Sequence, residues 1–94
     1  SVIIARKPHV ALYAGATSGY IPQDVNIEAL VDFLKQTSRD SSAPVFVFFG
    51  IIEQRRRPDL SALADPAGTM VDDLVLVASG PEKGGWFLYE LDQR

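Results

Sequence analysis

The sequence of 94 residues is 47% hydrophobic and 22% charged, the composition of one globular domain rather than of a disordered chain. Its formal net charge of −3 argues against a dedicated nucleic-acid binder, since such a protein carries a basic surface. It contains no cysteine, which excludes disulfide scaffolds, thiolate metal sites and cysteine nucleophiles.

Two short strands and one short helix are expected at the start of the chain. Residues 2–5 (VIIA) predict a short buried strand. Pro8 suits the first position of a helix, where its missing N–H is no loss, and residues 10–14 continue that helix. Gly15 is a natural helix end, because glycine adopts the left-handed conformation without strain. Residues 20–21 then allow only a brief strand before the proline that follows.

An amphipathic helix is expected over residues 27–38. Asn26 is a favourable N-cap residue ahead of it. Apolar side chains at i, i+3, i+4 and i+7 form one stripe: Ile27, Leu30, Val31 and Leu34. The polar side chains fall largely outside that stripe, so one face of this helix should pack on a core.

The second half of the chain predicts three strands and a further short helix. Residues 45–49 (VFVFF) are apolar throughout, which predicts a central strand covered on both faces. A short helix is expected over residues 58–64. A strand over residues 73–78, hairpin-turn chemistry at residues 80–85 and a returning antiparallel strand over residues 86–91 complete the chain. No apolar run reaches the ~18 residues that a membrane-spanning helix needs.

These elements follow the order β-α-β-α-β-α-β-β and should form one α/β domain over residues 1–94. The expected fold is a small layered sandwich with a mainly parallel sheet and an antiparallel C-terminal hairpin. The chain begins with Ser1 and enters strand-like sequence at once, which favours an excised piece of a longer protein.

The segment after the first expected strand is a candidate anion site. Arg6, Lys7 and His9 lie where that strand would end and a helix would begin. Free N–H groups at helix N-termini attract anions, and ligands of open α/β sheets gather at the carboxyl ends of strands. No glycine-rich loop lies between strand and helix, so a dinucleotide or P-loop site is excluded. Alternatively, Arg6 and Lys7 are solvated and His9 packs on the helix.

No catalytic or metal constellation is predicted. His9 is the only histidine, and a zinc site needs three or four ligands. Serine, histidine and aspartate are present, but without a nucleophile-elbow motif their presence indicates no triad. Asp72 and Asp73 are adjacent, so in a strand they would point to opposite faces, and they are expected to be turn residues ahead of a strand. No cofactor is implied.

Arg55, Arg56 and Arg57 form the one concentrated charge in the sequence. They are candidates for contact with phosphate, anionic lipid or an acidic neighbouring surface. The alternative is a solvated loop at the start of the helix over residues 58–64, since three residues fall short of a lipid-reading cluster. Trp86 and its aromatic neighbours are expected to pack on the sheet rather than to stack on a ligand.

Three quoted segments together carry a family resemblance: VIIARKPHVALYAG (residues 2–15), IEALVDFLKQ (residues 27–36) and RRRPDLSALADP (residues 55–66). The series resembles the C-terminal soluble domain of bacterial membrane glycosyltransferases of the dolichyl-phosphate-mannose–protein mannosyltransferase type, including relatives of the aminoarabinose transferases. The similarity covers nearly the whole chain, and Ala5 to His9 (ARKPH) is its most specific part.

The resemblance implies a multi-spanning parent enzyme that moves a sugar from a polyprenyl-phosphate carrier to an acceptor outside the cytoplasm. The domain would lie on the extracytoplasmic face of the membrane. Its partners would be the transmembrane part of the same polypeptide and a lipid-linked sugar phosphate or acceptor, with no nucleic acid. The family's catalytic carboxylates lie in the first external loop of the membrane part, which no position of this chain matches, so the fragment should not be catalytic alone. The alternative is a small binding or regulatory α/β module for a sugar phosphate or nucleotide, at Arg6, Lys7 and His9.

Overall fold

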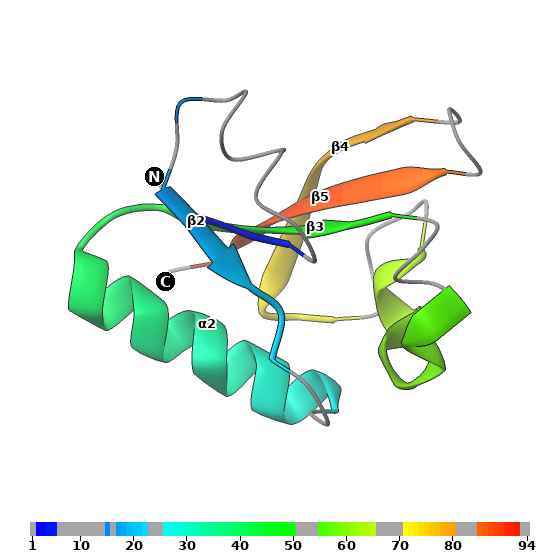
Figure 1. The fold of residues 1–94 in the computed structure, drawn as a ribbon, viewed down its shortest axis with the longest axis horizontal. Helices are drawn as coiled ribbons and strands as arrows, with labels where there is room; N and C mark the ends of the chain where they lie inside the picture. Colours follow the sequence, from blue (N-terminus) through cyan, green and yellow to red (C-terminus); the bar gives the residue numbers. More distant parts are fainter. Residues whose placement is uncertain are drawn as a thin grey trace.

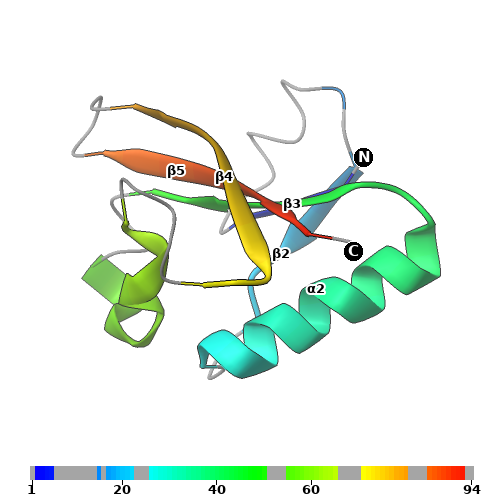
Figure 2. The same cartoon turned by 180° about the vertical axis from the view of Figure 1, so that it is seen from behind.

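The computed structural model describes residues 2–5, 15, 17–22, 26–50, 55–65, 71–80 and 85–92. Within them, five strands form one mixed sheet, with an α-helix and a 3-10 helix packed on one of its faces (Figures 1 and 2). The strand order is β2-β1-β3-β5-β4. The elements are β1 (Val2–Ala5), β2 (Thr17–Tyr20), α2 (Ile27–Ser41), β3 (Val45–Phe49), η1 (Pro58–Leu63), β4 (Leu74–Gly80) and β5 (Trp86–Leu91).

The N-terminal half of the sheet is parallel. β1 lies between β2 and β3, with Val2 opposite Thr17 on one side and Val45 on the other. Parallel neighbours cannot be joined by a tight turn, and α2 forms the crossover from β2 to β3. The expected bounds of β1 and β3 are confirmed, whereas β2 begins earlier than residues 20–21 because main-chain pairing with β1 does not depend on its side chains.

The C-terminal half of the sheet is antiparallel, and β5 lies between β3 and β4. The expected bounds of β5 are confirmed, and β4 extends to Gly80. Two pairings are thus parallel and two antiparallel, so the sheet is mixed rather than mainly parallel. The cause is the inner position of β5, which is antiparallel to both of its neighbours.

The expected order β-α-β-α-β-α-β-β is not confirmed. The predicted helix over residues 10–14 lies outside the described residues. The predicted helix over residues 58–64 is the 3-10 helix η1, and its backbone departs from helical angles at Leu60 (φ −105°, ψ 19°). Six residues interrupted in this way cannot build the repeated i→i−4 bonds that stabilise an α-helix.

The helix α2 forms as its apolar stripe predicts. Asn26 is its N-cap, and the side-chain Oδ1 accepts a hydrogen bond from the Ala29 backbone N–H at 2.9 Å. The stripe residues Leu30, Val31 and Leu34 are buried against the sheet. No helix among the described residues combines the length and hydropathy that a membrane crossing needs.

One hydrophobic core fills the space between the sheet and its two helices. Its buried members are Val2, Ile4, Leu30, Val31, Leu34, Val45, Val47, Phe49, Leu60, Leu63, Val71, Leu74, Tyr89 and Leu91. Alternate residues of β3 therefore point into this core, because successive side chains of a strand point to opposite faces.

The other face of the sheet is only partly covered. Phe46 and Phe48 of β3 are half-buried, whereas Val45 and its core-facing neighbours are fully buried. The expectation that residues 45–49 are fully covered on both faces is therefore wrong for one face. The Phe48 ring instead stacks on the Trp86 ring of β5, with centroids 5.9 Å apart.

Candidate anion site at the carboxyl edge of the sheet

The segment with Arg55, Arg56 and Arg57 lies at the edge of the sheet where the parallel strands end. β1, β2 and β3 are parallel, so their last residues, Ala5, Tyr20 and Phe49, end at the same edge, which we call the carboxyl edge. β5 is antiparallel to β3 and begins at this edge with Trp86. The segment that contains η1 lies at the same end of the molecule in both ribbon views (Figures 1 and 2).

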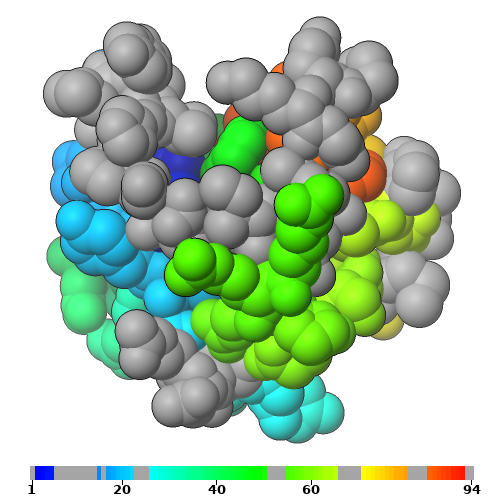
Figure 3. Space-filling view, turned by 45° about the vertical axis from the view of Figure 1, so that its right-hand side comes forward, coloured from blue at the N-terminus to red at the C-terminus, as the bar shows by residue number. Residues whose placement is uncertain are grey.

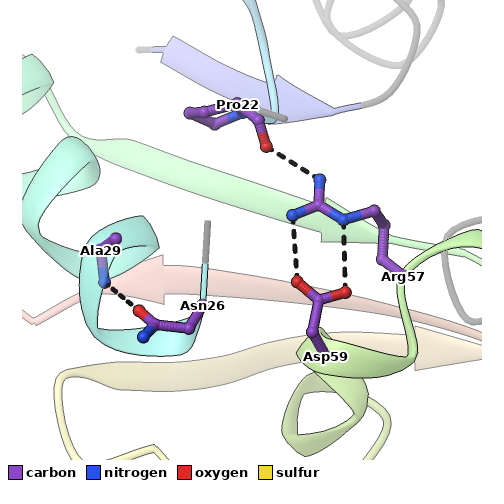
Figure 4. Close-up of polar contacts among 5 residues, drawn as sticks. All are labelled: Pro22, Asn26, Ala29, Arg57 and Asp59. Atoms are coloured by element: carbon purple, nitrogen blue, oxygen red, sulfur yellow. Dashed lines mark hydrogen bonds and ion pairs between the residues drawn. The ribbon is translucent and has the colours of Figure 1, made fainter. Parts of the chain in front are cut away.

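Arg57 ties the segment before η1 to the end of β2. Its Nη1 donates a hydrogen bond to the Pro22 carbonyl oxygen at 2.8 Å, across 35 positions of sequence. Its Nη2 pairs with Asp59 Oδ2 at 3.2 Å, and its Nε donates to Asp59 Oδ1 at 3.4 Å (Figure 4). The fork geometry of the guanidinium suits this two-pronged contact with a carboxylate. Arg57 is therefore committed to contacts within the chain.

Arg55 and Arg56 are presented differently. Both are exposed, and neither makes a hydrogen bond or ion pair with another described residue. Figure 3 brings the carboxyl edge toward the viewer and shows the green surface of residues 55–65 at the front of the molecule. Arg57 holds the backbone beside them in place. Because Arg55 and Arg56 are exposed, their guanidinium groups are available to an external anion.

Arg6, Lys7 and His9 lie outside the described residues, so their role as anion ligands stays a prediction. Arg6 directly follows Ala5, the last residue of β1. The carboxyl end of β1 and the anchored Arg57 segment are joined through β2, since the Ile21 N–H donates to the Ala5 carbonyl oxygen at 3.2 Å and Pro22 follows directly.

The remaining carboxylates form no candidate active site in the described part of the chain. No group of three or more His, Cys, Asp or Glu residues there could hold a metal ion. Asp72 and Asp73 form a turn directly ahead of β4, as the sequence predicts. They lie at the opposite edge of the sheet, because Leu74 pairs with the last residue of β5. Asp73 pairs with Lys35 at 3.4 Å.

A shallow surface hollow of about 240 Å³ also lies at that opposite edge. It is lined by Pro44, Val75, Glu90, Leu91 and Asp92. Two of its five lining residues are acidic, so its charge is opposite to that of an anion site.

The pKa values of two described groups depart from their ordinary values. The hydrogen bond from Arg57 lowers the pKa of the exposed Asp59 carboxyl below 3.8. Burial raises the pKa of the Tyr89 hydroxyl above 10.0, because a phenolate would be desolvated there. Tyr89 also donates a hydrogen bond to the Asp65 carbonyl oxygen at 3.3 Å. These shifts belong to structural contacts rather than to a reacting group.

Tyr89 makes stability depend on alkaline pH. Because its pKa is higher in the folded than in the unfolded state, its contribution is complete below pH 10 and is lost as the pH rises through the folded-state pKa. We expect Tyr89→Phe to flatten the fall in the free energy of unfolding as the pH rises above 10.0, measured by urea titration. An unchanged fall in Tyr89→Phe would contradict the assignment.

The sequence did not predict that Arg57 is paired within the chain whereas Arg55 and Arg56 are exposed. The available signal was Asp59, two residues after Arg57, which could have indicated a local charge pair. Sequence also could not place Trp86 at the same edge as the arginines, because that placement depends on the strand order.

No protein-family model matches the chain, and neither a curated protein nor a solved structure matches it significantly. A functional proposal therefore rests on the residues, the carboxyl edge and the family resemblance of the sequence.

Proposed function

We propose that this chain is a non-catalytic extracytoplasmic C-terminal domain of a membrane glycosyltransferase that transfers a sugar from a polyprenyl-phosphate carrier. Arg55 and Arg56 carry the structural part of the proposal, because they are exposed, unpaired with described residues and held at the carboxyl edge by Arg57. Ligands of open α/β sheets bind at such edges. The ARKPH segment and the other resembling segments support the link to this enzyme class.

In this proposal the domain contributes binding and orientation, while the transfer chemistry belongs to the transmembrane part of the same polypeptide. A carrier phosphate at the carboxyl edge would meet guanidinium groups, which recognise phosphate oxygens through paired N–H donors. No residue of this chain is assigned to bond making or breaking.

The test compares the 94-residue chain with the complete polypeptide that its gene encodes. We expect the complete polypeptide, in native membranes, to transfer a radiolabelled sugar from a polyprenyl-phosphate donor to its acceptor. The 94-residue chain should show no transfer above a protein-free control. Robust turnover by the isolated chain, or a reading frame that encodes no spanning segments, would overturn the proposal.

The exposure of Arg55 and Arg56 also favours a second candidate, a binding or regulatory module for a soluble sugar phosphate or nucleotide. A ligand that binds only the folded state raises the melting temperature in proportion to its saturation. Glucose 1-phosphate or AMP should then stabilise the chain, and Arg6→Ala and Arg55→Gln should each weaken that effect. Absence of a thermal shift with either compound would eliminate this candidate.

A further inference from the structure

The carboxyl edge combines cations with the single tryptophan of the chain. Trp86 is the first residue of β5, is half-buried and stacks on Phe48, near the end of β3. Indole rings combine an apolar body with one N–H donor and are enriched where apolar lipid meets polar headgroups. The segment of residues 55–65, which begins with the exposed Arg55 and Arg56, lies at the same end of the molecule (Figures 1 and 2).

The opposite edge of the sheet carries acidic side chains together with Lys35, which pairs with Asp73, and the exposed Arg39. Asp72 and Asp73 precede β4 there, and Asp92 follows β5 there. The chain as a whole is negative, with a formal net charge of −3. At the carboxyl edge Arg57 and Asp59 pair with each other, so the exposed Arg55 and Arg56 are the described cations there that can attract an anionic surface.

We propose that the carboxyl edge, with Arg55, Arg56 and Trp86, docks on the anionic phosphodiester headgroups of a bilayer surface. The inference rests on the proposed function in one respect, since a transmembrane part of the same polypeptide would keep the domain near a bilayer. The domain is then held with its arginines at the depth of the lipid phosphates.

A bilayer fits these features better than a nucleic acid does. Two exposed arginines at one edge match a planar layer of phosphates, whereas nucleic-acid binders carry a basic stripe or face along a groove. The negative charge of the remaining surface would also oppose wrapping by a polyanion. Trp86 adds a group whose preference is for the lipid interface rather than for a phosphate alone.

Vesicle flotation with three arginine variants tests the proposal. The vesicles are phosphatidylglycerol in phosphatidylcholine, with pure phosphatidylcholine as the neutral surface, at low and at physiological ionic strength. Arg55→Gln and Arg56→Gln each remove one charge from the carboxyl edge. Arg39→Gln is the matched control, because Arg39 is also exposed but lies in the last turn of α2, next to the start of β3 at the opposite edge. Circular dichroism checks that all variants remain folded.

We expect the unmodified chain to float with the anionic vesicles at low salt and to dissociate as screening increases. Arg55→Gln and Arg56→Gln should each lower the partition coefficient about fivefold, and Arg39→Gln should leave it unchanged. Trp86 fluorescence should shift to shorter wavelength only with anionic vesicles, because the indole moves into a less polar environment. Inorganic phosphate and single-stranded DNA, at matched phosphate concentration, should produce no shift.

Several results would contradict the proposal that the carboxyl edge docks on a bilayer. No flotation at low salt, or an equal loss in Arg39→Gln, would do so directly. Displacement from vesicles by inorganic phosphate would indicate a free-phosphate site instead, and an equal response to DNA would indicate a general polyanion contact. Flotation without a shift in Trp86 fluorescence would show that the carboxyl edge does not contact the bilayer. None of these results changes whether the complete polypeptide transfers sugar, so failure of the docking is distinguishable from failure of the proposed function.

Discussion

Replacing Phe49 with alanine will lower the free energy of unfolding by about 3–5 kcal/mol. Phe49 ends the central strand β3, has no exposed surface and packs in the core beneath the helices. The loss has two causes: the ring is no longer removed from water, and the cavity that it leaves does not close fully. Urea unfolding followed by far-ultraviolet circular dichroism measures the change.

Phe46→Ala is the matched control, because Phe46 has the same side chain on the same strand but faces the partly covered side of the sheet. It should cost clearly less than Phe49→Ala, since its ring is only half-buried. A domain of this size has about 5–14 kcal/mol of stability, so Phe49→Ala could unfold it. Phe49→Leu, with an expected loss of about 1 kcal/mol, keeps the comparison measurable. Equal losses at the two positions would contradict the assignment of the core face.

The core strands could be predicted because their apolar runs leave little choice of bounds. VIIA, VFVFF and WFLYEL give β1, β3 and β5 as expected. The C-terminal end of α2 was not predicted correctly, because the helix extends to Ser41 rather than to Ser38. Local side-chain bonds support that last turn, since Arg39 donates to Gln36 and Gln36 donates to Asp40. Hydrophobic periodicity carries no information about such polar pairs.

The strand order could not be read from the sequence, because it depends on contacts between distant segments. The sequence indicated a C-terminal hairpin but not which of its strands is the inner one. In the structure β5 is inner, and β4 is an edge strand with exposed Val75 and Val77. A register shift between Leu76 and Ala78 interrupts β4, as is common at sheet edges.

The candidate site was predictable as a set of residue types but not as an arrangement. Three consecutive arginines indicate positive charge, and only the fold separates Arg57, with its carbonyl and carboxylate partners, from the exposed Arg55 and Arg56. Pro22 is 35 positions away in sequence, so no local pattern links it to Arg57. The anchored arginine is what makes the other two a defined surface, because it limits how far their backbone can move.

Replacing Arg57 with glutamine should therefore destabilise the domain and loosen the carboxyl edge. The change removes the hydrogen bond to the Pro22 carbonyl oxygen, which is partly buried. Loss of such a charge-assisted bond corresponds to about 1–2 kcal/mol of the free energy of unfolding, measured by urea titration. Arg56→Gln is the control, because this neighbouring arginine is exposed and should change stability by less than about 0.5 kcal/mol.

The dependence of the free energy of unfolding on acidic pH tests the pairing of Arg57 with Asp59. Its hydrogen bond lowers the folded-state pKa of the Asp59 carboxyl below 3.8. The contribution of this group is therefore present above pH 3.8 and is lost as the pH falls through the lowered pKa. In Arg57→Gln this part of the acid dependence should disappear, and adding Asp59→Asn should then change nothing further. If Asp59→Asn has the same effect with and without Arg57, the two residues are not coupled, and the segment is held through Pro22 alone.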